Sequence, residues 1–176
     1  MSPAVIGVIG SNADTCSPAA LLAAEAVGLA IARHGATLVT GGRTGVMEAA
    51  SRGAREGGGL PVGILPSADR RDANPHVAIA IPTGLGSARG LTLIRSCDAL
   101  ILIGGGAGTL AELGYAYLEA RRIIVLRHTG GLADRLEPFL LDGLYVDERR
   151  LLPLLFADTP DAAVALALAA AQPPAG

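Results

Sequence analysis

One stretch of this 176-residue sequence combines the residue types that bind a phosphate group. An apolar run that ends at Ile103 is followed by Gly104, Gly105, Gly106, Ala107, Gly108 and Thr109. Glycine lets a backbone approach a ligand closely, and the free N–H groups and dipole of a helix N-terminus favour an anion. Thr109 adds a hydroxyl donor, and Glu112 lies close to the same end of the expected helix. The stretch predicts a phosphate site over Gly104–Thr109; the alternative is a tight structural turn without a ligand.

Two other turns have a similar setting and are predicted to contribute to the same site. One follows an apolar run over 36–40 and precedes a helical pattern over 46–56, and the other follows the first apolar run, over 5–9. In the turn after 36–40 the candidate ligand-binding residues are Gly41, Gly42, Arg43 and Gly45. In the turn after 5–9 they are Gly10 and Ser11, with Asn12. Arg43 fits a phosphate contact and a solvated turn residue equally well.

The elements that would position these residues alternate along the chain. Strands are predicted over 5–9, 36–40, 60–65, 77–81, 98–103, 122–126 and 144–146, and helices over 18–34, 46–56, 87–96, 109–120 and 130–141, with a last helix capped by Asp161. This order predicts an α/β fold: a doubly wound, mainly parallel, Rossmann-like sheet with helices on both faces. Residues 1–171 are expected to form a single domain and residues 172–176 a disordered tail.

Parallel topology also predicts where a ligand binds. In an open sheet of this kind, ligands bind beyond the carboxyl ends of the strands, where the strand order reverses. The turns at 10–12, 41–45, 82–86 and 104–109 all follow strands, so we expect them to gather at one edge.

Composition narrows the functional classes. The formal net charge is −2 and no basic run exceeds two residues, so a nucleic-acid partner is not expected. Cys16 and Cys97 are far apart, which argues against a disulfide framework or a metal site and fits a cytoplasmic protein. The longest apolar run, Ala162–Ala171, is about half of what a bilayer requires, so no membrane association is expected.

The residue types present exclude two known phosphate-binding motifs and pyridoxal phosphate chemistry. A GxGxxG motif would need glycine at position 109, which is threonine, and a P-loop needs a lysine, which the chain lacks altogether. The absence of lysine also excludes a Schiff base to pyridoxal phosphate. No cofactor is therefore predicted as a requirement.

The glycine motifs resemble those of the LOG superfamily, some of whose members were once labelled lysine decarboxylases. The resemblance lies in Gly41-Gly42-x-x-Gly45-x-Met47 and in Gly104-Gly105-Gly106-x-Gly108-Thr109-x-x-Glu112. A closer resemblance, to the short branch that includes the molybdenum cofactor carrier proteins, lies in Gly63–Pro66, Ala73–His76 and Ile81–Arg89. The family's arginine and glutamate fall on Arg89 and Glu112. Two positions depart from the LOG signature: its proline is Gly104 here, and its lysine after the arginine is Gly90.

The resemblance implies two functions of different classes. One is a carrier-like binding protein for a phosphorylated ligand, either a nucleotide or molybdopterin, with the molybdenum cofactor as possible cargo. The other is a phosphoribohydrolase that splits nucleoside 5′-monophosphates, AMP or cytokinin ribotides, into free base and ribose 5-phosphate, with Arg89 and Glu112 as catalytic residues. Glu112 could equally be a first-turn helix carboxylate, and Arg89 a surface arginine. A homodimer or a dimer of dimers is expected from the resemblance and from the alanine-rich stretches 19–32 and 162–171.

Overall fold

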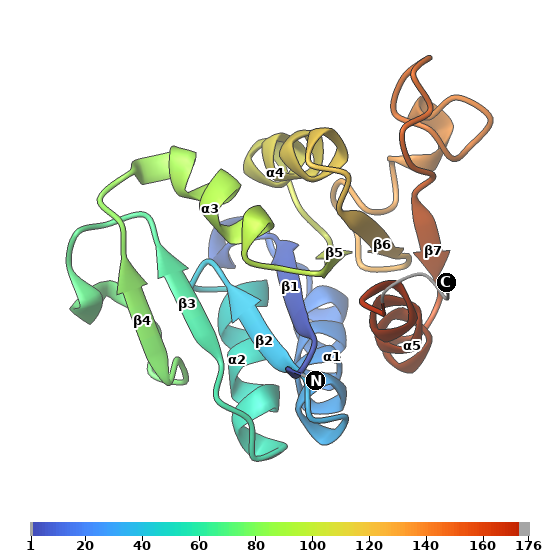
Figure 1. Ribbon diagram of the computed structural model, residues 1–176. Coiled ribbons are helices and arrows are strands. Elements are labelled where there is room, and N and C mark those ends of the chain that lie inside the picture. The colour runs from blue at the N-terminus through green and yellow to red at the C-terminus, as the bar shows by residue number, and fades with distance from the viewer. Residues whose placement is uncertain (1, 173–176) are drawn as a thin grey trace.

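The protein folds around one parallel sheet, seen in a computed structural model that describes residues 2–172 (Figure 1). Seven strands lie in the order β4-β3-β2-β1-β5-β6-β7, and every neighbouring pair is parallel. The strands are β1 (Val5–Gly10), β2 (Thr37–Thr40), β3 (Val62–Leu65), β4 (Ile79–Pro82), β5 (Ala99–Ile103), β6 (Arg122–Leu126) and β7 (Leu155–Ala157). The predicted fold class is confirmed.

Five helices cover the two faces of the sheet. They are α1 (Pro18–Arg33), α2 (Val46–Glu56), α3 (Arg89–Arg95), α4 (Ala107–Leu118) and α5 (Pro160–Ala170). Helices α1, α2 and α5 pack on one face and α3 and α4 on the other, as Figure 1 shows. The right-handed crossovers of parallel strands place helices on both faces in this way.

Strand β5 lies at the centre of both hydrophobic cores. Ala99, Ile101 and Ile103 point to the face of α1, α2 and α5, and Leu100 and Leu102 point to the face of α3 and α4. Successive side chains of a strand alternate between faces, so a strand covered on both sides needs apolar residues throughout. This is why the run before the glycine turn is continuously apolar.

Helices α1 and α2 cross at close range through small residues. A Cβ atom on Gly53 would collide with the carbonyl oxygen of Glu25, and one on Gly28 with that of Ala50. The Arg52 guanidinium donates two 2.8 Å hydrogen bonds to the Glu25 carboxylate beside this crossing. The alanine-rich face of α1 is therefore buried within the chain, against α2 and α5.

Replacing Gly53 with alanine is expected to destabilise the fold. Alanine is a better helix former by about 1 kcal/mol, but overpacking a tight contact costs about 1–3 kcal/mol. Equilibrium unfolding in urea measures the difference, and Gly114→Ala on α4, where a Cβ meets no atom within 4 Å, is the matched control. A Gly53→Ala variant as stable as the control would contradict the close crossing.

Two predicted elements after β6 are wrong. The stretch 130–141 is not a helix but a series of turns with one 3-10 turn at Glu137–Phe139, because Gly130 and Gly131 have φ values of 78° and 58° that no right-handed helix contains. The stretch 144–146 is not a strand: its single bridge is Tyr145 to Leu141, antiparallel. The last strand is β7, which pairs with β6; it has three residues, too few for a periodic pattern to show.

Differences at the ends of other elements are small. The N-cap of α5 is Thr159, whose hydroxyl accepts a hydrogen bond from the Ala162 amide, and Asp161 lies in the first turn rather than capping it. Of the predicted tail, residues 173–176 lie outside the described residues. Within residues 2–172, no helix is long and apolar enough to cross a membrane.

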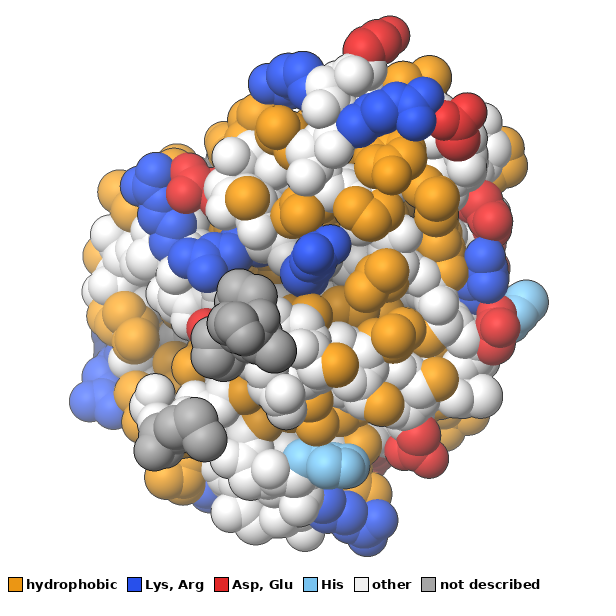
Figure 2. Space-filling view, turned by 45° about the vertical axis from the view of Figure 1, so that its right-hand side comes forward, with side chains coloured by type: hydrophobic (Ala, Val, Ile, Leu, Met, Phe, Trp, Pro, Cys, Tyr) orange, Lys and Arg blue, Asp and Glu red, His pale blue; other side chains and the backbone are white. Residues whose placement is uncertain are grey.

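Charged side chains of both signs are mixed on the side that carries β7 and α5. Figure 2 shows arginine and acidic side chains interspersed there among hydrophobic ones. Two of the ion pairs on the segment before β7 are Arg149–Asp147 and Arg150–Asp142. The face shown is therefore not a uniformly basic surface of the kind that a nucleic-acid backbone requires.

Candidate phosphate-binding site

The strand order reverses between β1 and β5, and a pocket lies at this point. The chain moves outward from β1 through β2 and β3 to β4, then returns to β5 on the other side of β1. A cavity of about 360 Å³ opens beyond the carboxyl ends of these strands. Its lining residues are Val8, Ile9, Gly10, Ser11, Asn12, Thr15, Gly41, Met47, Ser87, Arg89, Gly106, Ala107, Gly108, Thr109, Ala111, Glu112 and Tyr115. The pocket thus lies where a doubly wound sheet binds its ligand.

The first two glycines after β5 form the rigid base of the turn rather than its ligand-facing edge. Gly104 and Gly105 have φ values of 60° and 98° and are buried. The Gly104 amide donates to the Thr129 hydroxyl at 2.9 Å, and the Gly105 amide donates to the Ser11 hydroxyl at 2.7 Å. Both amides are therefore satisfied inside the protein.

The next residues of the turn face the pocket and begin α4. Gly106, Ala107 and Gly108 are exposed and line the cavity, and Thr109 lines it with only 4 % of its surface exposed. Gly106 is the N-cap residue and offers no side chain to cap the helix. The first amides of a helix lack intrahelical acceptors, and the helix dipole places partial positive charge there. This end of α4 is an uncapped helix N-terminus open to a ligand.

An arginine–glutamate ion pair forms another part of the wall. Arg89, the first residue of α3, donates a 2.8 Å hydrogen bond from one guanidinium nitrogen to Oε1 of Glu112 on α4. The side chains are only 14 % and 13 % exposed. Among the described residues, the second carboxylate oxygen of Glu112 has no hydrogen-bond partner. The ion pair leaves this oxygen for a ligand.

Burial changes the acidity of Glu112. Removal from water raises the pKa of this carboxyl above its ordinary value, and the charge and hydrogen bond of Arg89 offset part of that shift. The Arg89 guanidinium also packs on Gly41, where an added Cβ would collide with it. Gly41 therefore makes room for the arginine that orients Glu112.

The second glycine turn divides into a part that lines the pocket and a part that supports it. Gly41 lines the cavity, whereas Gly42, Arg43 and Gly45 do not. The Gly42 amide donates to the Thr40 hydroxyl at 3.0 Å, and the Arg43 carbonyl accepts a 2.8 Å bond from the Asn74 side chain. The Arg43 side chain is exposed, as expected for a solvated turn residue.

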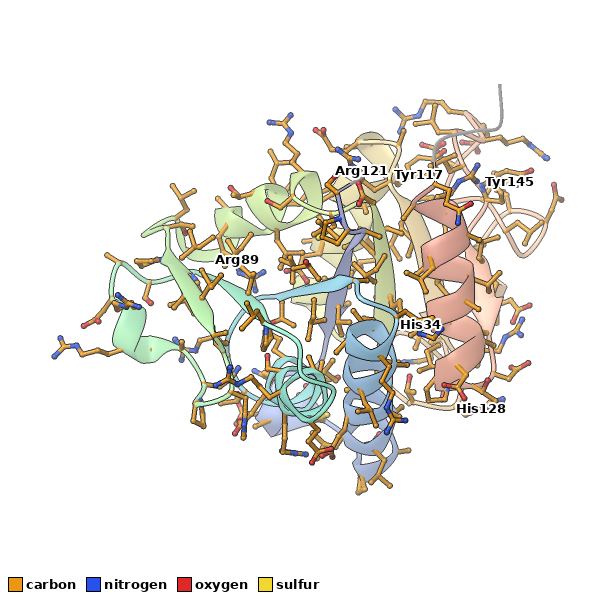
Figure 3. The ribbon with its side chains drawn as sticks, turned by 60° about the horizontal axis from the view of Figure 1, so that its bottom comes forward. His34, Arg89, Tyr117, Arg121, His128 and Tyr145 are labelled. Carbon is orange, nitrogen blue, oxygen red and sulfur yellow. The ribbon has the colours of Figure 1, made fainter. Side chains whose placement is uncertain are left out.

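The structure brings together most of the predicted site residues. Those that line the pocket are Gly10, Ser11, Asn12, Gly41, Arg89, Gly106, Ala107, Gly108, Thr109 and Glu112. Figure 3 places Arg89 against the sheet, far from His34 and His128, and no histidine lines the cavity.

Sequence reasoning missed several lining residues. Thr15 and Ser87 add hydroxyl groups, and Met47 lines the cavity although only 8 % of its surface is exposed. Tyr115 follows Glu112 by three residues, which places both on one side of α4. Only the helical spacing from Glu112 could have indicated Tyr115.

Metal ligands do not gather anywhere in the described part of the chain. Within residues 2–172, no three His, Cys, Asp or Glu side chains are close enough to hold an ion together. The described pocket offers an ion pair, hydroxyl groups and backbone amides instead.

The fold and the position of the pocket are those of a doubly wound, Rossmann-like α/β protein, and a sequence model identifies the family. The chain belongs to the SLOG cluster4 family, whose model matches residues 3–164. The resemblance to the LOG superfamily, and to the branch with the molybdenum cofactor carriers, is confirmed.

The similar proteins include a phosphoribohydrolase and two molybdenum cofactor proteins. A cytokinin riboside 5′-monophosphate phosphoribohydrolase of Mycobacterium marinum is 35% identical in an alignment of 159 residues that covers 84% of each chain. The molybdenum cofactor binding protein of Rippkaea orientalis has a TM-score of 0.81 and 36% identity over 94% of this chain and 96% of that one. The molybdenum cofactor carrier protein of Chlamydomonas reinhardtii has a TM-score of 0.79 and 33% identity over 96% and 98%.

Proposed function

We propose that this chain is a carrier-like binding protein for a phosphorylated small molecule, a nucleotide or a molybdopterin-type cofactor. The observation that carries the proposal is the uncapped N-terminus of α4, whose first residues face a pocket of about 360 Å³. A phosphate there accepts hydrogen bonds from backbone amides and benefits from the helix dipole. The structural similarity to the two molybdenum cofactor proteins supports this class of ligand.

The rest of the pocket suits the organic part of such a ligand. Met47 and Tyr115 supply apolar surface for a flat ring system, and Asn12 supplies an amide. Ligand pockets combine such apolar walls with a few polar groups that fix orientation. The molybdenum cofactor would be cargo, and we propose no cofactor that the protein itself requires.

A second candidate function is phosphoribohydrolase activity, which the buried Arg89–Glu112 pair favours. In this reaction the bond between the sugar carbon and the base nitrogen breaks, and the electron pair leaves with the base. The sugar develops positive charge, which the Glu112 carboxylate would stabilise. Water then adds to the sugar carbon and releases a proton, which balances the proton that the departing base nitrogen takes up. The similarity to the Mycobacterium marinum enzyme supports this candidate.

One experiment separates the two candidates. The protein is titrated calorimetrically with a panel of nucleoside 5′-monophosphates and with molybdopterin, and the nucleotide mixtures are then assayed for free base by chromatography. Binding without base release supports the carrier, and release of base supports the hydrolase. If no member of the panel and no pterin binds, the proposed function is wrong.

We also propose that the chain assembles as a homodimer or a dimer of dimers. One face of the alanine-rich α1 is covered by α2 and α5. Structural support for the assembly comes from the exposed apolar side chains of α4. Leu110, Tyr115 and Leu118 are 46 %, 37 % and 57 % exposed. Light scattering at micromolar concentration is expected to give a mass at least twice that of one chain, and a monomeric mass would contradict the assembly.

A further inference from the structure

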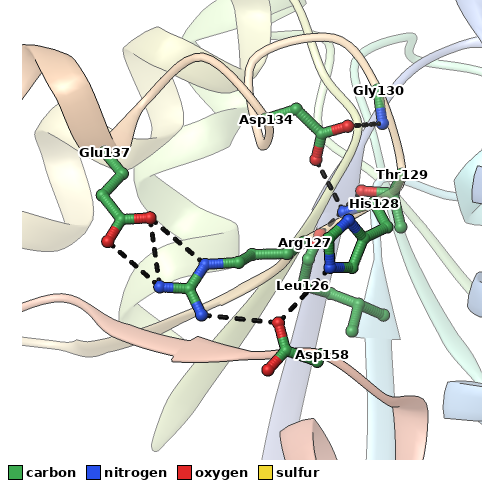
Figure 4. Close-up of polar contacts among 8 residues, drawn as sticks. All are labelled: Leu126, Arg127, His128, Thr129, Gly130, Asp134, Glu137 and Asp158. Atoms are coloured by element: carbon green, nitrogen blue, oxygen red, sulfur yellow. Dashed lines mark hydrogen bonds and ion pairs between the residues drawn. The ribbon is translucent and has the colours of Figure 1, made fainter.

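The loop after β6 supports the glycine turn from behind. This supporting loop comprises residues 128–134, shown in Figure 4. The Leu132 amide donates to the Gly105 carbonyl at 2.8 Å, and the Ala133 amide donates to the Gly104 carbonyl at 2.9 Å. The Thr129 hydroxyl accepts from the Gly104 amide.

Together these contacts account for the whole backbone of the turn's first two residues. Gly104 and Gly105 have four backbone polar groups, and three of them bond to the supporting loop. The fourth, the Gly105 amide, bonds to Ser11. Gly131 also lies so close that a Cβ there would be 2.5 Å from the Gly105 carbonyl oxygen. The orientation of Gly106–Gly108 toward the pocket therefore depends on the shape of this loop.

The supporting loop has a backbone shape that needs a side-chain restraint. His128, Gly130 and Gly131 all have positive φ values, of 64°, 78° and 58°. For a side-chain-bearing residue such as His128 this conformation is uncommon and costs free energy. The loop holds it because one side chain binds two of its amides.

That side chain is Asp134. One carboxylate oxygen accepts the His128 amide at 2.7 Å, and the other accepts the Gly130 amide at 2.9 Å (Figure 4). A carboxylate that accepts backbone N–H groups makes charge-assisted bonds, which are stronger than neutral ones. Neighbouring Thr129 is held by its own bond to the Leu126 carbonyl, at 2.7 Å.

We propose that Asp134 is a positioning residue of the ligand pocket: it holds the supporting loop, which in turn holds the glycine turn in its ligand-binding shape. The inference rests on the proposed function, since it concerns the affinity of that pocket. Asp134 does not line the cavity and acts through Leu132, Ala133 and Thr129.

The test compares Asp134→Ala and Asp134→Asn with a matched control, Asp147→Ala. Asp147 also accepts a backbone amide, that of Arg149 at 3.0 Å, together with the Tyr117 hydroxyl, and it makes no contact with the glycine turn. Affinity for AMP and for inorganic phosphate is measured by calorimetry. Amide hydrogen exchange at Leu132 and Ala133 reports the restraint directly.

For Asp134→Ala we expect faster exchange at both amides and affinity lower by about tenfold, a change of roughly 1.4 kcal/mol. Asp134→Asn keeps one acceptor oxygen, so its affinity is expected to fall less. If the alanine variant fails to fold, the asparagine variant still tests the proposal. The Asp147→Ala variant is expected to bind like the unaltered chain. A purely structural role would lower the unfolding midpoint of the Asp134 variants without changing affinity.

Two contrary results have distinct meanings. Unchanged affinity in Asp134→Asn and Asp134→Ala, with binding by the unaltered chain intact, overturns the positioning role alone. If the unaltered chain binds neither AMP nor phosphate, nor molybdopterin in the titration described above, the proposed function at this site and the positioning role are overturned together.

Discussion

Replacing Gly106 with leucine is expected to abolish binding of the phosphorylated ligand while the fold stays intact. Gly106 has a φ of −138°, which residues with side chains adopt, and an added Cβ meets no atom within 4 Å. The open space in front of it is the pocket, so the leucine side chain would occupy the volume of the phosphate. We expect affinity for AMP to fall by at least about 100-fold, or roughly 2.7 kcal/mol, in a calorimetric titration.

The same substitution on the same helix provides the control. A Cβ on Gly114 also meets no atom within 4 Å, but Gly114 does not line the cavity. Gly114→Leu is therefore expected to bind like the unaltered chain, and a cooperative urea unfolding transition in both variants is expected to show that the fold stays intact. A Gly106→Leu variant that retains its affinity would place the ligand elsewhere.

Replacing Glu112 with glutamine is expected to separate a carrier from a hydrolase. Glutamine keeps the shape of the side chain but removes the negative charge that would stabilise the developing cation on the sugar. If the protein releases base from a nucleotide, the rate should fall by about 100-fold or more, or roughly 3 kcal/mol, the effect of losing one key electrostatic contact. Ligand affinity should change much less, because the phosphate contacts at α4 remain.

A second ion pair between the same two helices supplies the control for this substitution. The Arg95 guanidinium donates hydrogen bonds of 3.0 and 2.8 Å to Glu119, and neither residue lines the pocket. Glu119→Gln is expected to leave base release unchanged. Equal rates in Glu112→Gln and the unaltered chain would exclude Glu112 as a catalytic residue, and absence of base release from every nucleotide would exclude the hydrolase.

The pH dependence follows from the environment of Glu112. Because burial raises the pKa of this carboxyl, it takes up a proton at a higher pH than an exposed glutamate does. A reaction that needs the carboxylate is therefore expected to slow as the pH falls through that raised pKa, and to be at full rate above it. A glutamine side chain does not titrate, so the rate of the Glu112→Gln variant should lack this acid limb.

Local sequence patterns were enough to predict the sheet and the position of the ligand turn. The run before Gly104 is apolar at every position because β5 is covered on both faces, and alternation of such runs with helical patterns requires parallel strands. Parallel strands carry their following turns to one edge, so Gly10, Gly41 and Gly106 could be assigned to one pocket without coordinates.

Local patterns failed where long-range contacts determine the conformation. The stretch 130–141 contains residues compatible with a helix, yet its glycines adopt positive φ values in a loop that bonds to Gly104 and Gly105, far earlier in the chain. The three residues of β7 form a strand only because β6 offers an edge to pair with. Neither effect leaves a periodic signal in the sequence.

By itself the sequence determined the fold class and the edge at which the pocket forms, because these follow from hydrophobic periodicity and the backbone freedom of glycine. Arg89 was assigned through the family resemblance. Only the tertiary structure decided which of the glycine-turn residues support the turn and which face the ligand pocket. Gly104 and Gly105 bond to the supporting loop, and Gly105 also bonds to Ser11, whereas Gly106–Thr109 remain open to the pocket. Arg89 meets Glu112 across 23 positions of sequence. The physical reason is that hydrogen-bond partners and burial depend on which distant segments meet in space, and no local pattern records that.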